Sequence, residues 1–359
     1  MRRLVLGLLL ALTVAAPASA IHWDPLPPRP GWILAPPPDL SAPAYILFDD
    51  QSDWVVVARN EDAQRAPAST TKIMTALVVA DFAAFDEMVT ISVTAPEAGE
   101  SEIGIVSGEV ITVADLLKAL LVRSANDAAV ALAEHVGGSV EGFSSLMNEK
   151  AAALGMTNSH FVNPHGLDEE GHYTSAADEL IMSRALLDNP ELASIVVLNG
   201  IDFPVAADGT QRGGPATNQL LEDYQGLLGI KTGYTLDASL VLAAAAEREG
   251  RRLFAVVMGS EGASGHFVDA EELLDFGFEK ARIPTTVSTI DPNGPLAQAA
   301  RGEALAWLGL SDLLVAPPIP PPIEVRVTRT PESPDWRQAL GWVDRFWGAL
   351  RAEMFADGA

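Results

Sequence analysis

The sequence predicts an α+β domain over residues 44–281, in which helices cover both faces of a largely antiparallel sheet. Three observations lead to this prediction. Two short β-type runs open the region, helix-type segments fill its middle, and three apolar runs close it. Because the strands are grouped instead of alternating with helices, strands next to each other in the sequence are expected to pair antiparallel.

The first two runs, "AYILFDD" and "DWVVVARN", flank the turn-forming residues 50–53, which predicts a hairpin. A helix is expected to begin near Ser69. The next helical segment, "TVADLLKALLVRSANDAAVALAEHVGG", is interrupted at residues 124–126 and ends at two glycines. A third helix is expected from about Ser139 to Leu154, before Gly155.

Residues 157–175 form a long loop in this interpretation, and "AADELIMSRALLDNPEL" after it is helical. The closing runs "GLLGIKTGY", "ASLVLAAAAE" and "RLFAVVMGS" are short, apolar and separated by turn-forming or charged residues. They predict three strands. The segment "VDAEELLDFGF" is expected to be the last helix of the domain.

The N-terminus has the pattern of an export signal. Residues 1–20 contain two arginines, an apolar run too short to cross a bilayer, and an Ala-x-Ala cleavage pattern at 18–20. An uncleaved anchor is the alternative. The proline-rich residues 21–43 are expected to be a linker. The mature protein is therefore expected in the periplasm or at the cell surface.

Residues 282–331 are rich in proline and are expected to be a reduced C-terminal domain or a linker. Residues 332–359 are expected to contain an amphipathic helix, in which the stripe over 335–355 includes two tryptophans. This helix has too many charges to span a membrane, but it can lie in a membrane interface. Packing against the protein itself is the alternative.

Composition excludes several functions. The chain of 359 residues has 48 acidic and 23 basic side chains, a net charge of −25 that argues against nucleic acid as a partner. It has no cysteine, so disulfides and thiolate metal sites are excluded. One loop contains three histidines and an aspartate at spacings that fit no zinc pattern: His160, His165, Asp168 and His172. No metal and no other cofactor is expected.

The stretch "APASTTKIMTALVVA" places Ser69 three residues before Lys72, which is one of five lysines in the chain. Residues i and i+3 share one face of a helix. A serine at a helix N-terminus lies beside unpaired N–H groups, which stabilise an oxyanion. A desolvated lysine close to another cation can act as a base. By itself, this spacing also fits a helix-capping serine followed by a surface lysine.

Two further motifs favour the catalytic interpretation. Ser124-Ala125-Asn126 lies between two helical halves, and Lys231-Thr232-Gly233 lies at the end of an apolar strand. Glycine there allows a substrate backbone to approach the sheet edge. A serine–lysine pair, a Ser-x-Asn element and a Lys-Thr-Gly element, in this order, form the active-site set of penicillin-recognising serine enzymes.

At these motifs the chain resembles the serine D-alanyl-D-alanine carboxypeptidases, the low-molecular-mass penicillin-binding proteins. The resemblance covers about residues 44–281 and implies a β-lactamase/DD-peptidase-like fold. It implies roles for nine residues, of which seven lie in the motifs and an eighth, Tyr234, directly follows the last motif. Ser69 would be the nucleophile, Lys72 its base and Ser124 a proton relay. Asn126 would contact the substrate amide, and Lys231, Thr232 and Gly233 would hold the substrate carboxylate at the strand. The N–H groups of Ser69 and Tyr234 would form the oxyanion hole.

The chain departs from the family pattern at a few positions. Ala125 replaces a glycine, Ser239 follows Ala238 where a glycine is expected, and His266 stands where an arginine usually helps to bind the terminal carboxylate. If His266 has this role, its pKa should start near the ordinary ~6.5 and rise when a carboxylate binds. Residues 282–331 are also shorter than the family's second domain.

The resemblance implies an exported enzyme that removes the terminal D-alanine from peptidoglycan pentapeptide stems and is acylated by β-lactams. One alternative is a β-lactamase, although the chain has no E-x-x-L-N segment of the best-known type. The other alternative is a non-catalytic wall-binding protein on the same scaffold.

Overall fold

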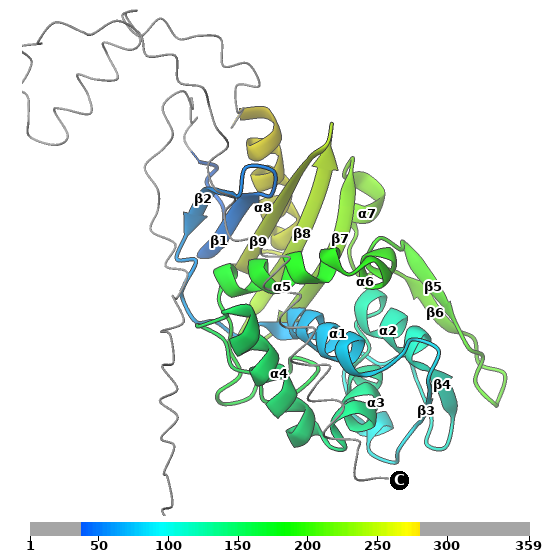
Figure 1. Cartoon of the computed structure of the whole chain (residues 1–359). Helices are drawn as coiled ribbons and strands as arrows, with labels where there is room; N and C mark the ends of the chain where they lie inside the picture. The colour runs from blue at the N-terminus through cyan, green and yellow to red at the C-terminus, as the bar shows by residue number, and fades with distance from the viewer. Residues whose placement is uncertain (1–36, 281–359) are drawn as a thin grey trace, which may run out of the picture.

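The computed structural model describes residues 37–280, which are coloured in Figure 1. Their centre is a five-stranded antiparallel sheet with the strand order β2-β1-β9-β8-β7. The predicted hairpin and the three predicted closing strands are confirmed, and they make up this sheet: β1 Ala44–Asp49, β2 Trp54–Arg59, β7 Leu227–Thr235, β8 Ser239–Arg248 and β9 Arg251–Ser260.

The predicted helices are also confirmed: α1 Thr71–Phe82, α2 Val113–Val122, α3 Asn126–Gly137, α4 Val140–Leu154, α5 Ala176–Asp188 and α8 Gly265–Asp275. One predicted helix is divided. Asn189 ends α5, and its side chain accepts hydrogen bonds from the first N–H groups of a separate helix, α6 Pro190–Val196. A short helix, α7 Leu220–Asp223, precedes β7, and a 3₁₀ turn, η1 Ala68–Thr70, precedes α1. The turn η2 Ala95–Glu97 and the π-helical turn η3 Phe276–Lys280 complete the list.

Two small hairpins have no counterpart in the prediction. One pairs β3 Met88–Thr90 with β4 Val110–Thr112, and the other pairs β5 Gly200–Phe203 with β6 Arg212–Pro215. Strands of three or four residues are too short to show a period-two pattern, and the β6 sequence "RGGP" has low strand propensity.

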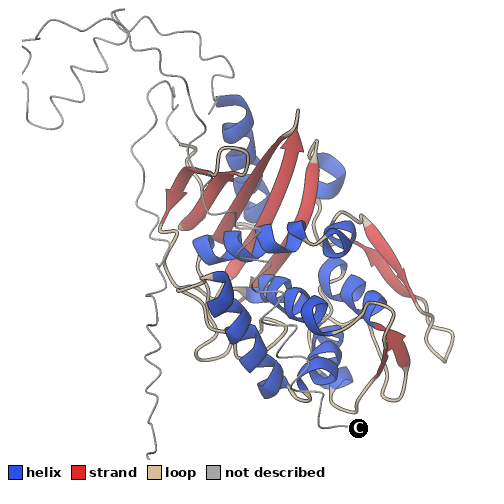
Figure 2. Ribbon diagram, in the orientation of Figure 1, coloured by secondary structure: helices blue, strands red, loops and turns tan. Residues whose placement is uncertain are grey.

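Helices cover both faces of the sheet, as the sequence predicts (Figure 2). Strand β1 shows this most simply, because every one of its residues is buried. Ile46 and Phe48 pack into the cluster that contains α1 to α6, whereas Tyr45 and Leu47 pack into the cluster that contains α8. This alternation follows from the period of two along a strand.

The described part of the predicted linker is fixed to the domain. Leu40 and Ala42 are buried beside α8, and Ser41 donates from its Oγ to Asp269 at 2.7 Å. Residues 1–36 and 281–359 lie outside the described residues, and with them the predicted signal segment, most of the linker and the predicted C-terminal helix. Within residues 37–280, no helix combines the length and the apolar character that a membrane span requires.

Candidate active site

Ser69 and Lys72 lie together at the start of α1. Lys72 is fully buried, and its Nζ lies 2.9 Å from Ser69 Oγ. Two oxygen atoms from distant segments complete its surroundings, Asn126 Oδ1 at 2.7 Å and the carbonyl of His165 at 2.6 Å. The Nδ2 of Asn126 donates to the carbonyl of Gly99 at 2.9 Å, which fixes the orientation of that amide.

These contacts direct the Lys72 amine toward Ser69. Burial, followed by the charge of Lys231, lowers the pKa of Lys72 well below its ordinary value, and Glu100 and Asp127 offset part of this change. A neutral amine has two N–H groups and one lone pair. The oxygens of Asn126 and His165 only accept hydrogen bonds, so they take both N–H groups. The lone pair then faces the hydroxyl of Ser69.

Ser124 and Asn126 lie at the break between α2 and α3, as predicted. Ser124 is buried and has a φ of +62°, which L-residues rarely adopt. The N–H of Asn126 donates to the carbonyl of Ser101 at 2.6 Å. A strained backbone conformation of this kind persists only where the surrounding structure holds it in place, and such conformations cluster at functional sites. The structure brings Asn126 into contact with Lys72 and holds Ser124 two residues before it.

Lys231 and Thr232 lie on β7, one of the two edge strands of the five-stranded sheet. Lys231 is fully buried, and burial lowers its pKa to about 7. Its Nζ donates to the carbonyl of Thr232 at 2.8 Å. The hydroxyl of Thr232 lies 2.8 Å from that of Thr217, which precedes α7. The charge of Lys231 also acts on Lys72, so the two predicted lysines belong to one site.

Gly233 brings β7 against the turn that carries Ser69. A Cβ atom on Gly233 would lie 2.9 Å from Ser69 N and 3.0 Å from the Cβ of Ala68. Only glycine permits this approach. The side chain of the next residue, Tyr234, is 59% exposed, which agrees with an expected role for its N–H alone.

The loop 157–175 closes the other side of this turn. A Cβ on Gly166, whose φ is +93°, would lie 1.8 Å from the carbonyl oxygen of Ala68. The carbonyl of Pro164 accepts from Thr75 Oγ1 at 2.6 Å, which fixes the loop to α1. Burial, the charge of Lys72 and that of His172 lower the pKa of His165 to about 3.

The histidines and the aspartate of the loop 157–175, which fit no zinc pattern, form hydrogen bonds with other protein groups. His172 Nδ1 accepts from the N–H of Val162 at 3.0 Å, so its Nε2 carries the proton and donates to Thr71 Oγ1 at 2.8 Å. Asp168 accepts from Thr235 Oγ1 at 2.6 Å, which connects the loop to the end of β7. Their contacts therefore hold the loop against α1 and β7.

His266 lies in the first turn of α8 and is 6% exposed. Burial lowers its pKa to about 4, although the charge of Asp269 acts in the opposite direction. The expectation of a group that starts near pH 6.5 is therefore wrong for the free protein, where the imidazole is neutral at pH 6–8. Its buried Nδ1 has no hydrogen-bond partner among residues 37–280.

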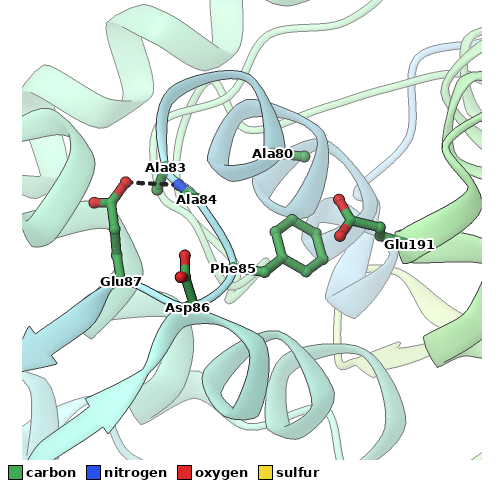
Figure 3. Close-up of a pocket in the computed structure, with 7 residues that line it drawn as sticks. All are labelled: Ala80, Ala83, Ala84, Phe85, Asp86, Glu87 and Glu191. Atoms are coloured by element: carbon green, nitrogen blue, oxygen red, sulfur yellow. Dashed lines mark hydrogen bonds between the residues drawn. The ribbon is translucent and has the colours of Figure 1, made fainter.

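A pocket of about 500 Å³ lies elsewhere (Figure 3). Its lining comes from the end of α1, the following loop and α6, and includes Phe85, Asp86 and Glu191. Ser69 precedes the other end of α1, a helix of 12 residues and therefore ~18 Å long. The pocket is separate from the serine–lysine site.

Sequence reasoning missed four parts of the site: the His165 carbonyl, Gly166, Thr217 and the position of Glu100 near Lys72. Every residue has a backbone carbonyl, so the role of the His165 carbonyl could not be found from residue types. The glycine and the threonine lie in the segments "FVNPHGLDEEGHYTSAADE" and "TNQLL", which resemble the family and direct attention to both.

Comparison with known proteins gives a consistent result. The family described as D-alanyl-D-alanine carboxypeptidase, peptidase S11, matches residues 33–262. D-alanyl-D-alanine carboxypeptidase DacF of Bacillus subtilis is 37% identical over 248 residues, which cover 67% of this chain and 62% of DacF. The match to DacC of Escherichia coli is 36% identical and covers 71% of this chain and 65% of DacC. The chain thus spans less than two thirds of the length of these two curated relatives.

A solved structure shows the same fold. The D-alanyl-D-alanine carboxypeptidase of Mycobacterium tuberculosis superposes with a TM-score of 0.66 at 34% identity, covering 70% of this chain and 95% of that one. The antiparallel sheet with helices on both faces is therefore shared with a protein of this type.

Proposed function

The chain belongs to the D-alanyl-D-alanine carboxypeptidase family, peptidase S11, and we propose that it removes the terminal D-alanine from peptidoglycan stem peptides through an acyl-enzyme on Ser69. One observation carries this proposal. The Nζ of the fully buried Lys72 lies 2.9 Å from Ser69 Oγ, and its two other hydrogen bonds go to oxygens that can only accept. The lysine is therefore arranged as a base for the serine.

In the first step, Ser69 Oγ attacks the carbonyl carbon of the penultimate residue while its proton passes to Lys72 Nζ. The carbonyl oxygen becomes an oxyanion, which the N–H groups of Ser69 and Tyr234 stabilise. The peptide C–N bond then breaks, and the amine of D-alanine leaves with a proton that Lys72 supplies, with Ser124 as the relay. Water hydrolyses the ester in the second half of the cycle, and Ser69 regains its proton.

The substrate carboxylate is expected at Lys231 and Thr232 on the edge of β7. A bound carboxylate favours the charged form of Lys231, whose pKa of about 7 lets it gain a proton on binding. Charge on Lys231 in turn disfavours charge on Lys72. Substrate binding thus helps to keep Lys72 in its basic form. Asn126 would contact the substrate amide.

The proposal is tested by mass spectrometry of a pentapeptide before and after incubation, which should show the loss of one alanine. Wild-type protein incubated with penicillin should carry a single adduct on the peptide that contains Ser69. The Ser69→Ala variant should lose both the peptidase activity and the adduct, because one oxygen performs both attacks. An adduct on a different serine would refute the assignment.

The same assay separates the alternatives. A β-lactamase would release hydrolysed penicillin in many turnovers, instead of retaining it as an adduct. A non-catalytic wall-binding protein would neither form the adduct nor shorten the peptide. The intact serine–lysine geometry supports the carboxypeptidase over this last alternative.

We also propose that the protein is exported and contacts the membrane surface through residues 335–355. The Ala-x-Ala pattern at 18–20 and the tryptophan-containing stripe support this. Truncation after Pro331 should release the protein from membranes and leave its activity on soluble peptides unchanged. A truncated protein that still sediments with membranes, or that unfolds, would contradict the anchor.

A further inference from the structure

Glu179 is a buried carboxyl group beneath the turn that carries Ser69. It lies in the first turn of α5 and is 0% exposed. Its Oε1 contacts Oγ1 of Thr70, the residue directly after Ser69. Its Oε2 is buried and has no hydrogen-bond partner among residues 37–280. A charged carboxylate here would have lost water without gaining a cation, which is strongly unfavourable.

The hydrogen bonds of Thr70 assign the proton. The Thr70 hydroxyl has one hydrogen and two acceptors in contact with it, the carbonyl of Pro67 at 2.7 Å and Oε1 of Glu179. The Pro67 carbonyl oxygen can only accept, so both contacts are hydrogen bonds at the same time only if Pro67 takes this hydrogen and Glu179 donates one of its own. The contact between Thr70 and Glu179 therefore requires the hydrogen of a neutral carboxylic acid. Glu179 donates to Thr70, which donates to Pro67.

The electrostatic surroundings agree with a neutral acid. Burial raises the pKa of Glu179 to about 8; the hydrogen bond with Thr70 lowers it, and the charge of Asp178 raises it. The elements packed against α5 contain further charged groups, but these have partners elsewhere or are exposed: Lys72 and Asp81 on α1, Asp49 on β1, Glu191 on α6, Glu247 and Arg248 on β8, and Arg251 and Arg252 on β9.

We propose that Glu179 is a positioning residue for Ser69, because its acid proton leaves Thr70 free to hold the Pro67 carbonyl and so fixes the turn of residues 67–69. This turn has little freedom of its own. Ala68 has a φ of +50°, and a Cβ on Gly233 would lie 3.3 Å from the Pro67 oxygen. The inference rests on the proposed role of Ser69 as the nucleophile.

Ionisation of Glu179 should loosen this turn. When the acid proton goes to solvent, the carboxylate accepts the one hydrogen of Thr70, and the Pro67 carbonyl loses its donor. Ser69 supplies both the attacking oxygen and an oxyanion-hole N–H, so a displaced turn slows acylation. Misplacement of a reacting group by about 1 Å can cost about a hundredfold in rate. Binding of the carboxylate at Lys231 and Thr232 does not depend on the turn.

The test compares wild type with Glu179→Gln in acylation by a chromogenic β-lactam from pH 6 to 10. The amide of glutamine can donate to Thr70 at every pH. The two proteins should acylate at similar rates at pH 6–7. Above a midpoint near pH 8, the wild-type acylation rate constant should fall at least about tenfold relative to the variant, with β-lactam affinity little changed. If the acylation rate constants of wild type and Glu179→Gln change in parallel with pH up to pH 10, the proposal is wrong.

Two further measurements keep the proposal falsifiable. Thr70→Val should slow acylation at all pH values, and adding Glu179→Gln to Thr70→Val should no longer change how the acylation rate depends on pH. If Thr70→Val acylates at the wild-type rate at each pH, the hydrogen-bond chain from Glu179 through Thr70 to Pro67 is wrong. Infrared difference spectra between pH 7 and 10 should show the carbonyl band of a protonated carboxylic acid in wild type but not in Glu179→Gln. That band is independent of catalysis, so it separates an error about Glu179 from an error about the enzyme's function.

Discussion

Gly233→Ala should place a methyl group between β7 and the turn that carries Ser69. The added Cβ would lie 2.9 Å from Ser69 N and 3.0 Å from the Cβ of Ala68, whereas ordinary contacts begin at 3.4 Å. The difference of 3.4 − 2.9, or 0.5 Å, must come from backbone movement. Either β7 or the turn has to move, and both change the distance between Ser69 N and the N–H of Tyr234, the two proposed oxyanion donors.

The size of the effect follows from this displacement. Loss of one oxyanion donor costs about 10²–10³ in rate, and misplacement by about 1 Å can cost about a hundredfold. A shift of half that size predicts a fall of about 10- to 100-fold in acylation, or about 1.4–2.7 kcal/mol. Overpacking also costs about 1–3 kcal/mol of folding stability, which a domain of this size tolerates.

The measurement is the rate of penicillin acylation, with thermal unfolding recorded on the same samples. Gly265→Ala is the matched control, because its Cβ would lie 3.4 Å or more from its neighbours and its φ is not positive. It should acylate like wild type. If Gly233→Ala acylates within twofold of wild type, the contact between β7 and η1 does not set the position of Ser69.

Three further predictions concern other positions. Ser239 has a φ of +57°, so Ser239→Gly should be more stable than Ser239→Ala by about 1 kcal/mol in urea unfolding; equal stabilities would contradict this. Glu100 raises the pKa of Lys72, so Glu100→Gln should lower that pKa and shift the acid limb of the acylation profile to lower pH; a shift to higher pH would contradict the sign. Because free His266 has a pKa of about 4, it is uncharged at pH 7.5, so His266→Arg adds a permanent positive charge and should lower the KM for a D-Ala-D-Ala peptide at that pH; an unchanged KM would show that residue 266 does not face the carboxylate.

The proposed catalytic motifs could be identified in the sequence because the chemistry expected of them depends on residue type and spacing, and the structure brings Ser69, Lys72 and Asn126 together. Ser69 and Lys72 are three residues apart, and the strand around Lys231 is apolar enough to identify. The third hydrogen bond of Lys72 could not be predicted, because it comes from a backbone carbonyl 93 residues away. The placement of that carbonyl depends on how the loop 157–175 folds against α1.

Glu179 is a second case in which sequence was insufficient. An acidic residue in the first turn of a helix usually interacts with the helix dipole and with water. The segment "SAADE" fits this description, and the side chain of Ser175 caps the helix by accepting from the N–H of Asp178. Burial of Glu179 results from the packing of α5 against α1, which places its carboxyl group on Thr70. Residue type and helical position alone predict a charged carboxylate in contact with water, instead of a buried carboxyl group.

Three segments contact the short turn that carries Ser69, the proposed nucleophile. Gly233 approaches it from β7, Gly166 from the loop, and Glu179 acts from α5 through Thr70. The contact at Gly166 is the tightest, since a Cβ would lie 1.8 Å from the Ala68 oxygen and the φ of +93° already excludes most side chains. A chain can therefore contain the serine–lysine pair and still be inactive if a side chain occupies either glycine position. The position of Ser69 is a property of these three contacts, and the motif alone does not specify it.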